Sequence, residues 1–144
     1  MKISWILFFL LVFQNNSFCQ TNDSTAIVKL LEKESSTWRS GDSAAHASCW
    51  KIEPFSTVII MTADGKTFSI PAGKLAHATK ENMGKGGTSK NSNYIMSIHG
   101  TNALVTHDET STTPAGVVSN TFEVRMLEKI NNDWKLTGQI IQVL

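Results

Sequence analysis

Two strand-like segments end the sequence, Thr121-Phe-Glu-Val-Arg-Met-Leu-Glu-Lys129 and Trp134-Lys-Leu-Thr-Gly-Gln-Ile-Ile-Gln-Val143. Both have the residue types and the alternation that are typical of β-strands. The polar segment Ile130-Asn-Asn-Asp133 lies between them and has the composition of a tight turn. The chain therefore ends in a predicted β-hairpin.

A first helix is predicted after the polar residues 20–24. Mostly apolar side chains recur at helical spacing until Gly41 interrupts the pattern. They form a stripe along one face of the predicted helix that consists of Ile27, Leu30, Leu31, Glu34 and Trp38. Two shorter helices are predicted beyond it. One covers residues 43–50 with Asp42 as its N-cap, and the other begins after Pro71 with an inner stripe of Ala72, Leu75, Ala76, Thr79 and Met83.

Four further strands complete the predicted order. Residues 57–61 and 66–70 flank Asp64-Gly65, a strong signal for a two-residue hairpin turn. The remaining segments are a loop over residues 84–93 and a second hairpin with strands over residues 94–99 and 103–110. This order is not a βαβ alternation, so it predicts an α+β domain whose helices gather on one face of a largely antiparallel sheet.

The element order and several short motifs resemble the SnoaL-like domains of the nuclear transport factor 2-like superfamily. The closing hairpin carries part of the likeness, in Arg125-Met-Leu-Glu-Lys129 and Trp134-Lys-Leu136. The other matching positions are Glu34, Gly41-Asp42, Cys49-Trp50 before Pro54, and Ala103-x-Val105-x-His107.

The resemblance implies a cystatin-like α+β cone, in which a strongly curved sheet wraps around about three helices from the N-terminal half. It also implies an internal pocket at the open end of the cone and a homodimer formed through the sheet. The superfamily contains isomerases, cyclases, dehydratases and binding modules. The likeness therefore indicates a shape and leaves the reaction open.

The first residues have the pattern of a secretory signal. Lys2 is followed by a nine-residue apolar run, Trp5–Phe13, which is much shorter than the roughly 20 residues of a membrane span. Small residues at Ser17 and Cys19 predict cleavage before Gln20, which gives a signal peptide over residues 1–19 and one domain over residues 20–144. We expect a secreted or periplasmic protein with no membrane attachment after cleavage. The alternative is a lipoprotein acylated at Cys19, which the large Phe18 disfavours.

Charge and cysteine content exclude several classes of partner. Without Lys2 the basic residues number the same as the 12 acidic ones, so the mature chain has no basic excess for nucleic acid or an anionic membrane surface. Cys49 remains as a lone cysteine, which gives no internal disulfide framework.

Glu34 is the first candidate for chemistry, because a carboxylate on the apolar stripe of a helix is unusual. Burial in the cone would raise its pKa and suit it to act as a general acid or base. The alternative is a structural carboxylate that pairs with Arg125 or binds backbone amides.

His46 and Cys49 lie three residues apart on the second helix, so they could form a dyad or half of a metal site. No third ligand is signalled nearby, and cysteine is among the most buried residue types. We therefore expect Cys49 to pack in the core, and we predict no metal and no cofactor.

A second candidate set lies in the predicted hairpin over residues 94–110. If the turn pairs Gly100 with Ala103, then Tyr94 shares a face with His107 and Glu109, and the three could form an acid–base set with an oxyanion donor. A shift by one residue would place Asp108 and Thr106 on that face instead. The alternative is that these polar residues line the outer face of the sheet.

The remaining pocket candidates are Trp38, His46, Trp50 and Arg125. His77 and His99 are expected to be exposed to solvent. Three functions stay open: binding of a small, partly apolar ligand in the cone, a cofactor-free lyase or isomerase that uses a Glu/His set, and a non-catalytic dimeric interaction domain. The volume of the cavity in the cone distinguishes the interaction domain, whose cone is filled by its own tryptophans, from the ligand-binding protein and the enzyme.

Overall fold

The structure is a computed structural model that describes residues 14–144. Its elements are α2 (Gln14–Ser40), α3 (Ser43–Ala47), β1 (Thr57–Met61), β2 (Thr67–Pro71), α4 (Ala72–Ala76), the 3-10 helix η1 (Lys80–Asn82), β3 (Thr88–His99), β4 (Asn102–Thr112), β5 (Val118–Ile130) and β6 (Asp133–Val143). The predicted signal peptide falls mostly outside the described residues, and its last residues, Gln14–Cys19, begin α2. Within residues 14–144 no helix combines the length and the apolar character that crossing a bilayer requires.

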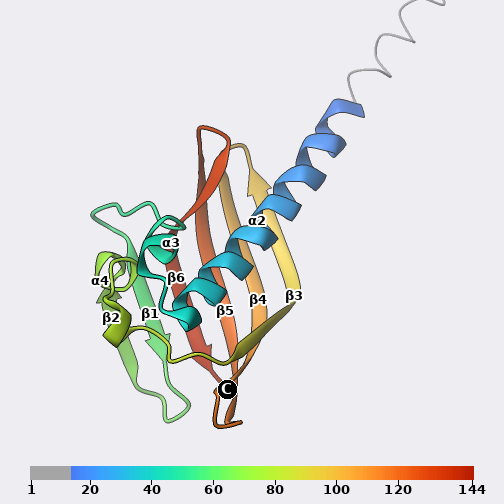
Figure 1. Cartoon of the computed structure of the whole chain (residues 1–144). Coiled ribbons are helices and arrows are strands. Elements are labelled where there is room, and N and C mark those ends of the chain that lie inside the picture. The colour runs from blue at the N-terminus through green and yellow to red at the C-terminus, as the bar shows by residue number, and fades with distance from the viewer. Residues whose placement is uncertain (1–13) are drawn as a thin grey trace, which may run out of the picture.

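The strands of the described chain form one open sheet in the order β2-β1-β6-β5-β4-β3. Neighbouring strands are antiparallel except β1 and β6, which run parallel. α2 lies diagonally across one face of this sheet, and α3 and α4 lie toward the β1–β2 edge (Figure 1). The predicted α+β class and the curved, largely antiparallel sheet around N-terminal helices are confirmed.

The closing hairpin is the longest pairing predicted from the sequence, and it forms as expected. Ile130 pairs with Asp133, and the two residues between them have positive φ angles of 49° at Asn131 and 70° at Asn132. Asparagine tolerates this left-handed backbone better than most residues, which makes a two-residue turn available.

Two β-bulges change which residues face the helices. In β6 the register shifts opposite Met126 and Leu127, so the core side chains Trp134 and Leu136 are even-numbered. The cavity-lining side chains Gln139 and Ile141 beyond the bulge are odd-numbered. A bulge adds one residue to one strand and bends it. A second bulge in β3 lies between Ser92 and Ile95, where Asn93 has a φ of 55°.

Several predicted boundaries are wrong. Residues 20–24 belong to α2 and are not a lead-in. The third helix is broken, because α4 ends at Ala76 and His77 leaves the helical region with a φ of −109°. β3 begins at Thr88, so the predicted loop 84–93 is shorter, and the connection between β1 and β2 covers residues 62–66 and not two residues.

The N-terminal half of α2 is fixed to the closing hairpin by Asp23. This side chain accepts hydrogen bonds from Lys129 Nζ at 2.6 Å and from Trp134 Nε1 at 3.1 Å. The bond from Lys129 lowers the pKa of Asp23. This tertiary contact explains why a polar stretch continues the helix.

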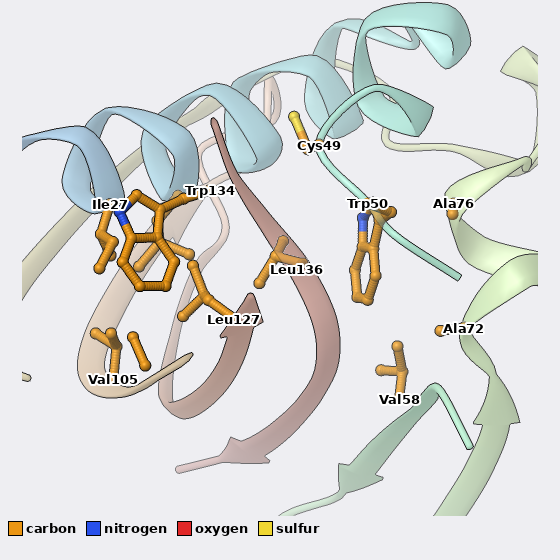
Figure 2. Packing of buried hydrophobic residues seen from close by; sticks show 12 residues of the cluster. Ile27, Cys49, Trp50, Val58, Ala72, Ala76, Val105, Leu127, Trp134 and Leu136 are labelled. Carbon is orange, nitrogen blue, oxygen red and sulfur yellow. The ribbon is translucent and has the colours of Figure 1, made fainter. Parts of the chain in front are cut away.

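The apolar core lies between α2, α3, α4 and the sheet (Figure 2). Its members are Ile27, Leu31, Cys49, Trp50, Val58, Ala72, Ala76, Ala103, Val105, Leu127, Trp134 and Leu136. Cys49 is fully buried, and its thiol donates to the Ala45 carbonyl at 3.4 Å. The prediction that Cys49 packs in the core is confirmed.

Candidate functional site

A cavity of about 260 Å³ remains between the helices and the concave face of the sheet. Its wall contains apolar and charged side chains together, namely Glu34, Ser35, Trp38, Arg39, His46, Trp50, Val58, Ile60, Leu75, Glu109, Thr121, Glu123, Arg125, Gln139 and Ile141. The cone is therefore not filled by its own tryptophans.

Local periodicity explains how the charged side chains converge. Glu34 and Trp38 are four residues apart on α2, so they lie on one face of the helix. On β5 Glu123 and Arg125 are two residues apart, so both point to the concave face. Glu109 reaches the same space from β4.

Arg125 is the centre of a buried ion-pair network. Its Nη1 donates to Glu34 Oε2 at 3.2 Å, and its Nη2 donates to Glu123 Oε2. Burial alone would lower the pKa of Arg125, but the neighbouring carboxylates outweigh it and raise the pKa above the ordinary value. The Glu34–Arg125 pair that the sequence offered as an alternative is present.

His107 lies behind this network. Its Nε2 accepts a hydrogen bond from Arg125 Nε at 3.3 Å, and its Nδ1 is 3.4 Å from the carbonyl oxygen of Asp108. Burial and the nearby Arg125 charge lower the pKa of His107. The geometry therefore fits a neutral imidazole with its proton on Nδ1.

Glu109 forms a second pair at the cavity wall. Its Oε1 accepts from Arg39 Nη2, and its Oε2 accepts from the Ser35 hydroxyl at 2.6 Å. Burial raises the pKa of Glu109, although the Ser35 hydroxyl opposes the effect. A carboxyl group with a raised pKa can hold a proton at a pH where an exposed one cannot.

The His46 ring lies between two tryptophan rings at the cavity, and it is tilted relative to both. Its ring centroid is 5.3 Å from that of Trp38 and 6.4 Å from that of Trp50. The His46 Nδ1 atom is 3.8 Å from Glu34 Oε1, and the Cys49 thiol bonds elsewhere. The described residues contain no group of three or more His, Cys, Asp or Glu side chains placed to hold a metal ion.

The loop before β3 contains Gly84, Gly86 and Gly87 and binds the C-terminal end of α2, which carries Trp38 and Arg39. Gly84 N donates to the Trp38 carbonyl at 3.1 Å, and Gly86 N donates to the Arg39 carbonyl at 2.8 Å. A Cβ atom on Gly87 would lie 2.1 Å from the Thr112 carbonyl oxygen, so only glycine fits this close approach.

The predicted Tyr94–His107 neighbourhood is present, but in another register. Ile98 pairs with Ala103, and His99 pairs with Asn102 around a two-residue turn, so the predicted Gly100–Ala103 pairing is wrong. The shift is by two residues and keeps the same face. The ring centroids of Tyr94 and His107 are 5.3 Å apart, yet neither residue lines the cavity.

The sequence candidates that do line the cavity are Glu34, Trp38, His46, Trp50, Glu109 and Arg125. His77 and His99 are exposed, as predicted. Sequence reasoning missed Arg39, Glu123 and Gln139. Glu123 carried a usable signal, because it lies two residues before Arg125 on the same strand and so faces the same side.

Known structures share this fold at low sequence identity. An NTF2-like protein of unknown function from Shewanella baltica matches with a TM-score of 0.65 and 18% identity, over 86% of this chain and 95% of that one. An NTF2-like protein with a cystatin-like fold from Novosphingobium aromaticivorans gives 0.67 and 13%, over 93% and 90%. A candidate scytalone dehydratase from the same organism gives 0.66 and 12%, over 89% and 88%.

No family model matches the sequence, and no curated protein matches it. The structural likeness nevertheless agrees with the motifs of the closing hairpin and with the element order. The protein is therefore a domain with the NTF2-like, cystatin-like fold, as the sequence predicts. The fold contains a pocket with apolar walls and a buried ion-pair network on one side.

Proposed function

We propose that the protein binds a small, partly apolar ligand in the cavity of its cone. The observation that carries this proposal is the cavity of about 260 Å³ whose wall combines tryptophans with buried charged groups. Sites for small molecules are mostly apolar, with a few polar groups that fix orientation. This volume lies just below the usual range of ligand pockets, about 300 to 1,000 Å³, so the ligand is small.

Unused hydrogen-bond donors support the same proposal. Trp50 Nε1 and Arg39 Nε are buried and have no hydrogen-bond partner among the described residues, and both side chains line the cavity. Buried donors of this kind are costly unless something accepts from them. A ligand oxygen or a water molecule in the cavity would fill that role.

A cavity-filling variant tests the binding proposal. Ile60 lines the cavity, whereas its neighbour Ile59 points to the other side of β1. We expect Ile60→Trp to abolish the binding of small aromatic probes measured by calorimetry, and Ile59→Trp to retain it. Equal binding by both variants, or no binding by the natural chain, would contradict the proposal.

A second candidate function is a cofactor-free lyase or isomerase, and Glu109 favours it. This carboxyl group lines the cavity with a raised pKa, which is the direction of change that suits a carboxyl group to act as a general acid or base. The test is deuterium exchange next to the carbonyl of small ketones in D₂O, followed by NMR. Exchange that Glu109→Gln abolishes would support catalysis, and its absence with the natural chain would count against it.

A homodimer through the convex face of the sheet is also proposed. Ile95, Leu104 and Met126 are 73%, 48% and 38% exposed, and Leu104 lies directly opposite Met126. Such an apolar surface favours a two-fold contact. Light scattering should give twice the monomer mass, and Leu104→Glu should give the monomer. Phe55→Glu is the control, because Phe55 is 72% exposed in the segment before β1.

Export remains a proposal that rests on the apolar run Trp5–Phe13. Cleavage before Gln20 would leave Asp23 and its bonds to the closing hairpin in the mature chain. Intact mass of protein purified from its native source tests this. A chain that retains residues 1–19, or a lipid mass on Cys19, would contradict a soluble exported protein.

A further inference from the structure

The cavity wall carries more carboxylates than guanidinium groups. Glu34, Glu109 and Glu123 line it together with two arginines, Arg39 and Arg125. Arginine stays protonated in proteins, so one carboxylate charge is left over when all three are ionised. A buried charge without a counter-charge is unfavourable. The cavity is therefore short of one positive charge.

Carboxylates already accept from both guanidinium groups, although Arg39 Nε has no partner among the described residues. Arg125 donates to Glu34, Glu123 and His107, and Arg39 donates to Glu109. An anionic ligand would have to displace a carboxylate to reach Arg125. One that accepted from Arg39 Nε would still face the carboxylates of Glu34, Glu109 and Glu123 in the same cavity. The ion-pair network therefore disfavours an anion, although it contains arginine.

One carboxylate oxygen remains for a donor in the cavity. Both oxygens of Glu123 accept hydrogen bonds, from Thr121 and Arg125, and both oxygens of Glu109 accept, from Ser35 and Arg39. Glu34 Oε2 accepts from Arg125, whereas the nearest polar partner of Oε1 among residues 14–144 is His46 Nδ1 at 3.8 Å. That distance is too long for a hydrogen bond, and Glu34 itself is 6% exposed.

Two indole rings line the same cavity as this oxygen. His46 lies against Glu34 and is flanked by the rings of Trp38 and Trp50, and both tryptophans line the cavity. Tryptophan is the aromatic side chain that attracts cations most strongly through its ring face. A carboxylate oxygen in a cavity lined by two indoles is a combination that recognises an ammonium group.

We propose that the cavity selects a small organic cation, an amine whose ammonium group binds Glu34 and whose apolar part contacts Trp38 and Trp50. This inference rests on the proposed binding function and specifies its ligand class. A bound ammonium supplies the missing positive charge. The titratable and charged groups around this position are Glu34, Arg39, His46, Glu109, Glu123, Arg125 and His107.

A matched series of probes tests the charge preference. Benzylammonium, benzyl alcohol and benzoate have the same ring and carry a positive, zero and negative charge at neutral pH. We expect calorimetry at low salt to give benzylammonium a dissociation constant about tenfold or more below that of either other probe. Equal affinity for benzyl alcohol, or tighter binding of benzoate, would overturn the cation proposal while leaving ligand binding intact. Binding of none of the three would overturn both.

Two isosteric variants test which carboxylates produce the preference for benzylammonium. Glu34→Gln removes the negative charge and leaves one acceptor oxygen, which Arg125 can keep, with an NH₂ donor in place of the other. Glu109→Gln removes the surplus charge without unpairing Arg125. Each should bring the preference for benzylammonium over benzyl alcohol close to one. Glu32→Gln is the control, because Glu32 lies exposed on α2 outside the cavity. If Glu34→Gln fails to fold, Glu109→Gln and the probe series still decide, and a preserved preference in Glu109→Gln would overturn the charge argument.

Discussion

The concave interior has two halves that are built by the same elements but filled differently. Along α2, β4 and β5 the inward-facing positions change from apolar to polar or charged, from Leu31 to Glu34, from Val105 to His107 and from Leu127 to Arg125. The apolar half is closed by packing. The charged half contains the cavity.

The contrast separates stability from recognition. Burial of apolar side chains stabilises the first half by roughly 25 cal/mol per Å². Buried ion pairs often contribute little net stability, because desolvation offsets their attraction. The charged half is therefore poorly explained as a stabilising device, and its position at the cavity supports a role in ligand recognition.

The largest expected effect comes from removing the centre of the charged half. Arg125→Met leaves Glu34 and Glu123 buried without their counter-charge, and breaking a buried pair costs about 3 to 5 kcal/mol. Urea unfolding at neutral pH measures the loss. Lys66→Met is the control, because Lys66 is 70% exposed in its pair with Asp64, and it should cost about 1 kcal/mol or less. Similar losses of unfolding free energy in the two variants would show that the buried network contributes no more to stability than the control pair.

A cavity in the apolar half should cost stability without changing the site. Leu31 is fully buried in the core cluster, so Leu31→Ala should lower the free energy of unfolding by about 2 to 5 kcal/mol. The affinity for benzylammonium should stay as in the natural chain. Leu30→Ala, at a partly buried neighbour, should cost less. Loss of probe binding in Leu31→Ala would show that the two halves are coupled.

A smaller effect is expected for Glu34→Gln. Arg125 keeps Glu123 but loses one charged partner, which should lower the free energy of unfolding by about 1 to 3 kcal/mol. A double-mutant cycle with Arg125→Met isolates the pair. Strong coupling is expected from the 3.2 Å contact. Coupling near zero would mean that Glu34 contributes to the cavity alone.

The smallest effect is a pH dependence that belongs to His107. Its pKa is lowered in the folded protein, so the unfolded chain takes up the proton first as the pH falls. The stabilising contribution is present above the ordinary imidazole pKa of about 6.5 and is lost as the pH falls through the lowered value. His107→Gln should remove at most about 1.4 kcal/mol per pH unit of this slope. Unfolding from pH 7.5 to 5 measures it.

Glu109 should act with the opposite sign. Its pKa is raised in the folded protein, so its contribution is full below the ordinary carboxyl pKa and is lost as the pH rises through the raised value. Urea unfolding of the natural chain and of Glu109→Gln over the same pH range isolates this part of the dependence of the unfolding free energy on pH. Identical slopes in the two proteins would contradict the raised pKa.

Much of the fold follows from local patterns, and the failures have identifiable causes. The closing hairpin, the Asp42 cap and the buried Cys49 depend on nearby residues and were predictable. The extension of α2 through residues 20–24 depends on Asp23 meeting Trp134. A contact between residues 111 positions apart cannot be predicted from the sequence around either residue.

The sequence by itself determined the α+β class, the order of the elements and the unusual carboxylate at Glu34. Only the tertiary structure decided which polar residues meet at the cavity. Bulges shift the facing of β3 and β6 by one residue, and a strand's side chains alternate with a period of two. The pairs Glu34–Arg125 and Arg39–Glu109 join α2 to β5 and β4, so they depended on how the sheet bends around α2, which is decided only when the strands pair and the helix packs on them.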